Sequence, residues 1–148
     1  MPGLGLIGVR MAPALRRHLL GGAFWTAVLG LAPLALVADD FQTPAIPALE
    51  LHDRLEAQDR PLVVDVREPG EFRIGHVPGA VNMPEPELEQ HLPEFKGDRA
   101  VVLYCIFGKR TKLAEQLLLD HEVPNVFHLQ GGLKGWMGAG FPIAKGGG

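Results

Sequence analysis

The stretch that decides the fold is Ala100-Val101-Val102-Leu103-Tyr104-Cys105-Ile106-Phe107-Gly108-Lys109-Arg110-Thr111. Its first five residues form a continuous apolar run, which predicts a buried strand. From Lys109 to His121 the apolar residues recur at helical spacing, which predicts a helix. A strand that leads directly into a helix, without alternation of apolar and polar residues, indicates an α/β fold with a parallel sheet. Cys105 then lies at the carboxyl end of a strand.

The chain on either side of this stretch continues the same alternation of strands and helices. The other strands expected are Leu62–Val66, Ala80–Asn82 and Val126–Leu129, and the other helices expected are Ala48–Ala57, Pro69–Ile74 and Pro86–Leu92. In parallel sheets, ligands bind beyond the carboxyl ends of the strands. Cys105 therefore occupies a position at which chemistry is expected.

Cys105 is the sole cysteine of the chain, which excludes an internal disulfide and a cysteine-rich metal site. Backbone amides at the start of the following helix, together with the charges of Lys109 and Arg110, favour the thiolate form. Gly108 supplies the permissive backbone that a tight loop needs. The alternative is that Cys105 is a small buried apolar side chain, since free cysteine is among the most buried residue types.

The charges are distributed unevenly along the chain. It contains 14 Lys plus Arg and 17 Asp plus Glu, a net charge of −3. Residues 1–38 hold three arginines and no acidic residue, so the remainder has 11 basic and 17 acidic residues and a net charge of −6. An acidic domain argues against sequence-independent binding of nucleic acid. Because the chain has no serine, every serine nucleophile is also excluded.

The first 38 residues have the charge order of an export signal. Arg16 and Arg17 precede an uncharged run from Leu19 to Ala38, and Asp39 follows. We expect a signal peptide that is removed on export. An uncleaved membrane anchor is the alternative, because about 20 apolar residues are enough to span a bilayer.

Four groups of residues in the remainder follow one another in a fixed order. They are Val64-Asp65-Val66-Arg67-Glu68 with Glu71-Phe72, Gly75-His76-Val77-Pro78-Gly79-Ala80-Val81-Asn82, Tyr104 to Thr111, and Gly131-Gly132 with Trp136. In these motifs the chain resembles the rhodanese family of sulfurtransferases. The resemblance implies a single rhodanese-like domain over residues 47–143, with a mostly parallel five-stranded sheet and helices on both faces. We expect a linker over residues 39–46 before it and a disordered tail over residues 144–148 after it.

The resemblance also implies sulfur transfer with Cys105 as the nucleophile. The thiolate would take a sulfane sulfur from thiosulfate or a persulfide donor, become a persulfide, and pass the sulfur to cyanide or to a thiol. The residues expected to bind the substrate through loop amides and charges are Ile106, Phe107, Gly108, Lys109, Arg110 and Thr111. Asp65 and Arg67 would support this loop, with a purely structural ion pair as the alternative. The resemblance implies no metal and no organic cofactor, and it places the domain in the bacterial periplasm, or outside the cytoplasm if anchored.

The length of this loop and the residues after Cys105 bear on the type of reaction and on the sulfur donor. Related phosphatases and arsenate reductases use a loop longer by one residue, whereas four residues separate Cys105 from Arg110 here, which favours sulfur chemistry. Many thiosulfate-active relatives have a polar or basic residue directly after the cysteine. Ile106 and Phe107 stand there in this chain, which favours a persulfide or a partner protein as the donor. A persulfide carrier without turnover, or a protein-interaction module, is the main alternative to an enzyme.

Overall fold

The computed structural model describes residues 40–58 and 60–147. The leader predicted for residues 1–38 lies outside these described residues. Within them, no helix combines the length and the apolar character needed to cross a membrane.

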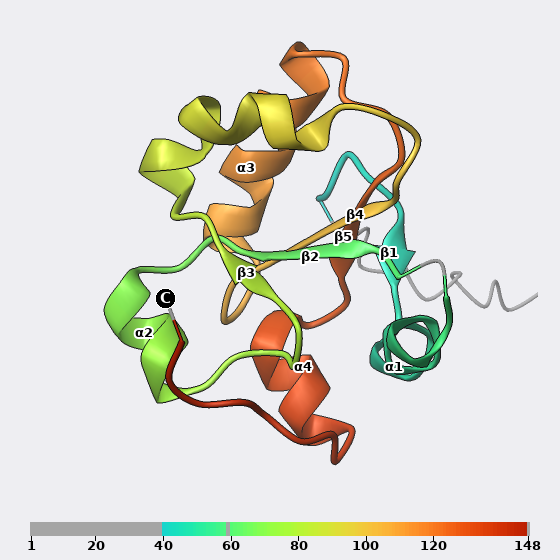
Figure 1. The fold of residues 1–148 in the computed structure, drawn as a ribbon, viewed down its shortest axis with the longest axis vertical. Coiled ribbons are helices and arrows are strands. Elements are labelled where there is room, and N and C mark those ends of the chain that lie inside the picture. Colours follow the sequence, from blue (N-terminus) through green and yellow to red (C-terminus); the bar gives the residue numbers. More distant parts are fainter. Residues whose placement is uncertain (1–39, 59, 148) are drawn as a thin grey trace, which may run out of the picture. The chain divides into compact units, whose positions relative to one another are not determined.

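Strands and helices alternate along the described chain (Figure 1). The elements are β1 (Ala45–Ile46), α1 (Ala48–Glu56), β2 (Leu62–Asp65), α2 (Pro69–Ile74), β3 (Val81–Asn82), the 3₁₀ helix η1 (Glu85–Phe95), β4 (Val101–Tyr104), α3 (Lys109–Asp120), β5 (Val126–Leu129) and α4 (Gly132–Gly138). The five strands form one sheet in the order β1-β5-β4-β2-β3, and every pairing is parallel. The predicted α/β fold and its five-stranded sheet are confirmed, and the sheet is wholly rather than mostly parallel.

Helices cover both faces of the sheet and bury two separate apolar clusters. α3 and η1 lie over one face, and α1 and α4 lie over the other (Figure 1). Successive side chains of β4 alternate between the faces, as in any strand. Leu103 therefore packs under α3 and η1, whereas Tyr104 packs against the α1 and α4 side. Cys105 continues this alternation and belongs to the cluster beneath α3.

Two flanking segments are more ordered than the sequence indicated. The expected linker over residues 39–46 includes β1, which pairs with β5, and the His128 N–H donates to the Pro44 carbonyl at 3.1 Å. A strand of two residues is too short to show a periodic pattern, which explains why it was not predicted.

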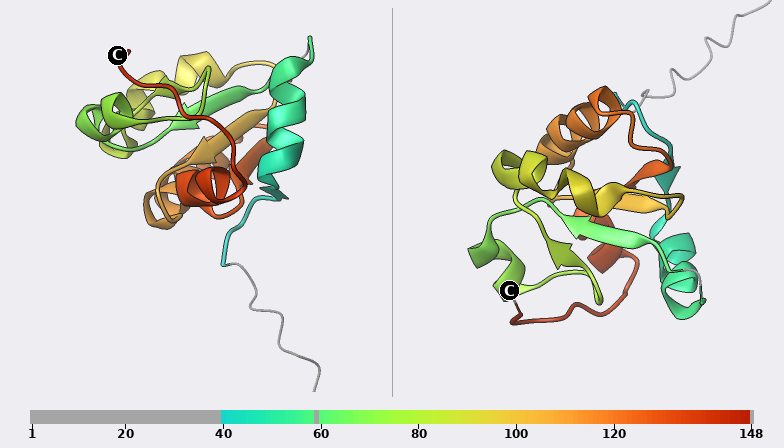
Figure 2. Two further views of the ribbon diagram at one scale, coloured as in Figure 1. Left: turned by 90° about the horizontal axis from the view of Figure 1, so that it is seen from below. Right: turned by 45° about the horizontal axis from the view of Figure 1, so that its top comes forward.

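The prediction of a disordered tail over residues 144–148 is wrong for Ala144, which is ordered. Ala144 forms an antiparallel bridge with His76, with N–H to carbonyl distances of 2.9 and 3.0 Å. The segment after α4 runs back toward α2, as both sets of views show (Figure 2). Its hydrogen bonds come from backbone groups, so the residue types in this glycine-rich segment did not indicate the pairing.

Candidate active site

Cys105 lies at the carboxyl end of β4, in the four-residue turn that leads into α3. The residue is 2% exposed. Gly108, which precedes the first residue of α3, has a φ of 106°, and this left-handed conformation favours glycine. Its N–H donates a hydrogen bond to Cys105 Sγ at 3.0 Å. The strand, the turn and the helix therefore bring a backbone donor to the sulfur, as the sequence predicted.

Several hydrogen-bond donors act together on the Cys105 thiol. Burial raises the pKa of the thiol. The Thr111 hydroxyl and the amides of Thr111, Gly108 and Phe107 together lower it by more, so the net shift is downward. The Thr111 hydroxyl is buried and has no hydrogen-bond partner within normal geometry among the described residues, so it is free to donate toward the sulfur. The site therefore favours the thiolate through hydrogen-bond donors, among them backbone amides of the kind that the sequence predicted.

Backbone N–H groups at the start of α4 donate hydrogen bonds to the Cys105 loop. The Leu133 N–H donates to the Cys105 carbonyl at 2.8 Å, and the Lys134 N–H donates to the Ile106 carbonyl at 3.4 Å. A Cβ atom on Gly132 would lie only 2.5 Å from the Cys105 carbonyl oxygen, so this close approach requires glycine. Trp136 anchors α4, because its side chain is buried and its indole N–H donates to the Pro142 carbonyl at 2.7 Å. These bonds hold the carbonyls of Cys105 and Ile106 against the start of α4.

Arg110 forms a bidentate ion pair with Glu71 of α2. The distances from its two terminal nitrogens to the carboxylate oxygens are 2.5 and 2.9 Å. Glu71 raises the pKa of Arg110, and the charge of Cys105 adds to that effect. The guanidinium thus ties α3 to α2 and acts on the sulfur only through its charge. Sequence reasoning missed the role of Glu71, because the two residues are 39 positions apart.

Asp65 and Arg67 form a buried ion pair beside the site. Arg67 donates to both Asp65 oxygens, at 2.5 to 3.1 Å, and to the Gly75 carbonyl at 2.7 Å. Burial lowers the pKa of Arg67, but the Asp65 hydrogen bond and charge raise it by more. The side chains of Arg67 and Asp65 are 5% and 0% exposed. This geometry corresponds to the structural alternative, in which the pair fastens the turn after α2 to the end of β2.

The outer rim of the loop is apolar and basic. Ile106 is half-buried against the α1 and α4 side of the core, whereas Phe107 is 68% exposed. Lys134 Nζ lies 5.2 Å from the centre of the Phe107 ring, a cation–π contact that sequence reasoning did not find. Lys109 is exposed at the first position of α3. An incoming molecule would thus meet Phe107 and these two lysines.

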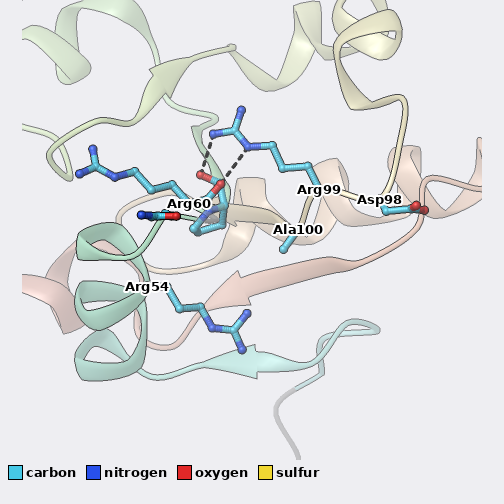
Figure 3. Close-up of a pocket in the computed structure, with 7 residues that line it drawn as sticks. Arg54, Arg60, Asp98, Arg99 and Ala100 are labelled. Carbon is cyan, nitrogen blue, oxygen red and sulfur yellow. Dashed lines mark hydrogen bonds between the residues drawn. The ribbon is translucent and has the colours of Figure 1, made fainter.

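A cavity of about 550 Å³ lies at the opposite ends of the central strands, next to Arg54, Arg60 and Arg99 (Figure 3). Its guanidinium groups point in different directions. Arg99 donates to the carbonyls of Arg60 and Pro61, at 3.0 and 3.1 Å. This cavity is therefore a less suitable candidate site than the Cys105 loop. Elsewhere in the described part of the chain, no group of His, Cys, Asp or Glu side chains could hold a metal ion.

His76, a residue of the second motif, packs inside the domain. Its ring stacks on Phe72 with 3.7 Å between ring centres, and Nδ1 lies 2.9 Å from the Phe72 carbonyl oxygen. The side chain is buried. This arrangement indicates a packing role for His76.

Comparison with known proteins identifies a rhodanese-like domain over residues 47–139. The chain is 34% identical over 98 residues to a sulfurtransferase from Allochromatium vinosum, a match that covers 66% of this chain and 92% of the relative. It is similar to the solved structure of thiosulfate sulfurtransferase from Pseudomonas aeruginosa, with a TM-score of 0.66 and 29% identity, over 71% of this chain and 21% of that one.

A second similar structure is a protein of unknown function from Rhodopseudomonas palustris, described as a possible tyrosine phosphatase. The TM-score is 0.61 and the identity 31%, over 69% of this chain and 85% of that one. The chain spans 60%, 61% and 53% of the length of three other curated relatives, from Bacillus subtilis, Synechocystis and Mycobacterium tuberculosis. The likeness to those longer proteins is therefore a likeness to part of each.

Proposed function

Because the chain belongs to the rhodanese-like domain family, we propose that it transfers sulfane sulfur through a persulfide on Cys105. A sulfurtransferase and a thiosulfate sulfurtransferase are among the proteins to which it is similar. The observation that most supports the proposal is the set of donors around Cys105 Sγ. These donors lower the pKa of the thiol, and they would stabilise the negative charge of a persulfide at the same place.

In the first half-reaction, the Cys105 thiolate attacks the outer sulfur of the donor. With thiosulfate, a bond forms between Cys105 Sγ and that sulfur, and the bond from the outer sulfur to the sulfonate sulfur breaks. Sulfite leaves with the electron pair of the broken bond. The charge of the thiolate passes to the terminal sulfur of the new persulfide. The Gly108 N–H and the Thr111 hydroxyl are the donors best placed to stabilise it.

In the second half-reaction, an acceptor attacks the terminal sulfur of the persulfide. A thiolate acceptor forms a new persulfide and cyanide forms thiocyanate, and in both cases the electron pair of the broken S–S bond returns to Cys105. The thiolate is thereby restored without any outside oxidant or reductant. A thiolate that is already stable is a good leaving group, so the lowered pKa of Cys105 assists this step as well.

The rim favours a persulfide or a protein donor over free thiosulfate. Arg110 is held by Glu71, and Arg67 is held by Asp65, so neither guanidinium is available to pair with a small dianion. The exposed ring of Phe107 offers apolar contact instead. We therefore expect slow turnover with thiosulfate and faster turnover with a persulfide.

Phosphate-ester hydrolysis is the reaction that this loop fits less well. A phosphatase of the same fold would need a loop one residue longer and a guanidinium free to bind the phosphate. Only four residues separate Cys105 from Arg110, and both terminal nitrogens of Arg110 contact Glu71. A phosphatase assay is nevertheless a useful control, given the similarity to the protein from Rhodopseudomonas palustris.

Mass spectrometry of the intact protein tests the proposal. After incubation with thiosulfate or an organic persulfide, the wild type should gain the mass of one sulfur atom, and Cys105→Ser should gain none. Release of that sulfur by cyanide or a thiol, repeated over many turnovers, would distinguish an enzyme from a carrier that is loaded once. A wild type that forms no adduct with either donor would refute the proposed reaction.

A further inference from the structure

The segment Asp40–Pro44, which we call the strap, lies along α3 just before the first strand. Its side-chain contacts are Asp40 with Lys112, Gln42 with Gln116, and Thr43 with Glu115. Glu115 and Gln116 follow Lys112 by three and four residues, so each lies near Lys112 on the surface of the helix. The strap is thus fastened to the helix that begins directly after the Cys105 loop.

A buried polar cluster anchors the strap. The Thr43 hydroxyl donates to Glu115 Oε1 and lies 3.2 Å from His128 Nδ1, and the same Glu115 oxygen is 3.3 Å from that nitrogen. The side chains of Glu115 and His128 are 1% and 2% exposed. Withdrawing Thr43 would remove a hydrogen-bond partner from buried polar groups, which costs about 1–3 kcal/mol. The strap therefore has a defined position on the domain.

Phe41 connects this anchored strap to the loop. Its ring stacks on His128 with 3.8 Å between ring centres, and Lys112 Nζ lies 5.0 Å from the ring centre. The edge of the ring rests on Gly108, where an added Cβ would lie 2.7 Å from Phe41 Cζ. Gly108 is also the residue whose N–H donates to Cys105 Sγ. One aromatic ring therefore touches the backbone that supplies a hydrogen bond to the reactive sulfur.

We propose that Phe41 is a positioning residue for Cys105, whose ring keeps the Gly108 N–H directed at the sulfur. A glycine has many accessible backbone conformations, so its peptide unit stays in one orientation only if neighbouring groups restrict it. Phe41 supplies this restriction at Gly108, and α4 restricts the loop at Cys105 and Ile106. This inference rests on the proposed function, because a persulfide would form on the sulfur that Gly108 contacts.

The test measures alkylation of Cys105 by iodoacetamide as a function of pH, in the full chain, because only the thiolate reacts. In Phe41→Ala, the rate at pH 7 should fall about two- to tenfold, the range expected when one hydrogen bond is weakened. The rate at high pH should equal that of the wild type. Phe41→Leu, which keeps an apolar contact, should recover part of the loss. The charged groups around the loop are the same in every variant: Asp65, Arg67, Glu71, Lys109, Arg110, Lys112 and Lys134.

Gln42→Ala is the matched control, since Gln42 belongs to the strap but does not touch Gly108. It should alkylate like the wild type. An unchanged pH profile in folded Phe41→Ala would overturn the inference and leave Phe41 as an ordinary packing residue. If Phe41→Ala does not fold, Phe41→Leu decides: slower alkylation than Gln42→Ala supports positioning, and equal rates overturn it. Failure of the wild type to form a persulfide would refute the proposed function but would not alter this comparison.

Discussion

Gly108 donates its N–H to the sulfur of Cys105, and Thr111 and Phe107 also lower the pKa of the thiol through uncharged donors. Burial alone would raise the pKa of the thiol, so these donors outweigh a substantial opposing effect. Fixed neutral dipoles need no counter-ion and leave the mouth of the site free for a donor or acceptor. At the scale of single residues, the reactivity of Cys105 thus depends on orientation more than on nearby charge.

Thr111→Val should raise the pKa of Cys105, because it replaces the hydroxyl with a methyl group of similar size. Fewer molecules are then thiolate at pH 7, so alkylation by iodoacetamide should slow about two- to tenfold. The pH at half-maximal rate should move up toward about 8.5, the value of an ordinary thiol. Thr111→Ser keeps the hydroxyl and should behave like the wild type. If valine left the pH profile unchanged, Thr111 would have no part in stabilising the thiolate.

At the scale of elements, three helices meet around one loop. α3 begins at its end, α2 holds Arg110 through Glu71, and α4 donates to the carbonyls of Cys105 and Ile106. The α4 contact depends on Gly132, since any side chain there would collide with backbone atoms of the loop. The shape of the active loop is therefore set by elements far from it in the sequence.

Gly132→Ala and Gly138→Ala form a matched pair at the two ends of α4. The Gly132 substitution adds a methyl group 2.5 Å from the Cys105 carbonyl oxygen, at a φ of +58°. It should destabilise the fold by about 1–3 kcal/mol and slow persulfide formation. A Cβ on Gly138 would meet no atom within 4 Å, so that variant should retain both properties. Urea denaturation and mass spectrometry measure the two effects, and equal behaviour of the pair would contradict this role for Gly132.

At the scale of the whole molecule, local patterns predicted the sheet and the place of Cys105. The predicted bounds of α2 and β5 match the structure, because Pro69 and the apolar run at Val126 are strong local signals. The contacts of Phe41 with Gly108 and of Glu71 with Arg110 could not be predicted in this way. These contacts join segments that are distant in the sequence. Neither Phe41 nor Glu71 stands out in the local pattern of apolar and polar residues. The sequence thus indicated the candidate nucleophile, but not what orients the groups around it.

The Asp65–Arg67 pair offers a stability test that concerns the whole domain. Arg67→Met leaves the Asp65 carboxylate buried without its partner and releases the Gly75 carbonyl, which should cost about 3–5 kcal/mol. A domain of this size has a total stability of about 5–15 kcal/mol, so the loss should be plain in urea denaturation.

The double variant Asp65→Leu with Arg67→Met removes both charges together. Since no unpaired charge then remains buried, it should be more stable than Arg67→Met alone, by about 1 kcal/mol or more. If the single variant were instead as stable as the wild type, the ion pair would not fasten the turn after α2 to the sheet. If only the double variant recovered stability, the cost of the single change would come from the stranded carboxylate. The pair would then be structural, and the positive potential at Cys105 would come from Arg110.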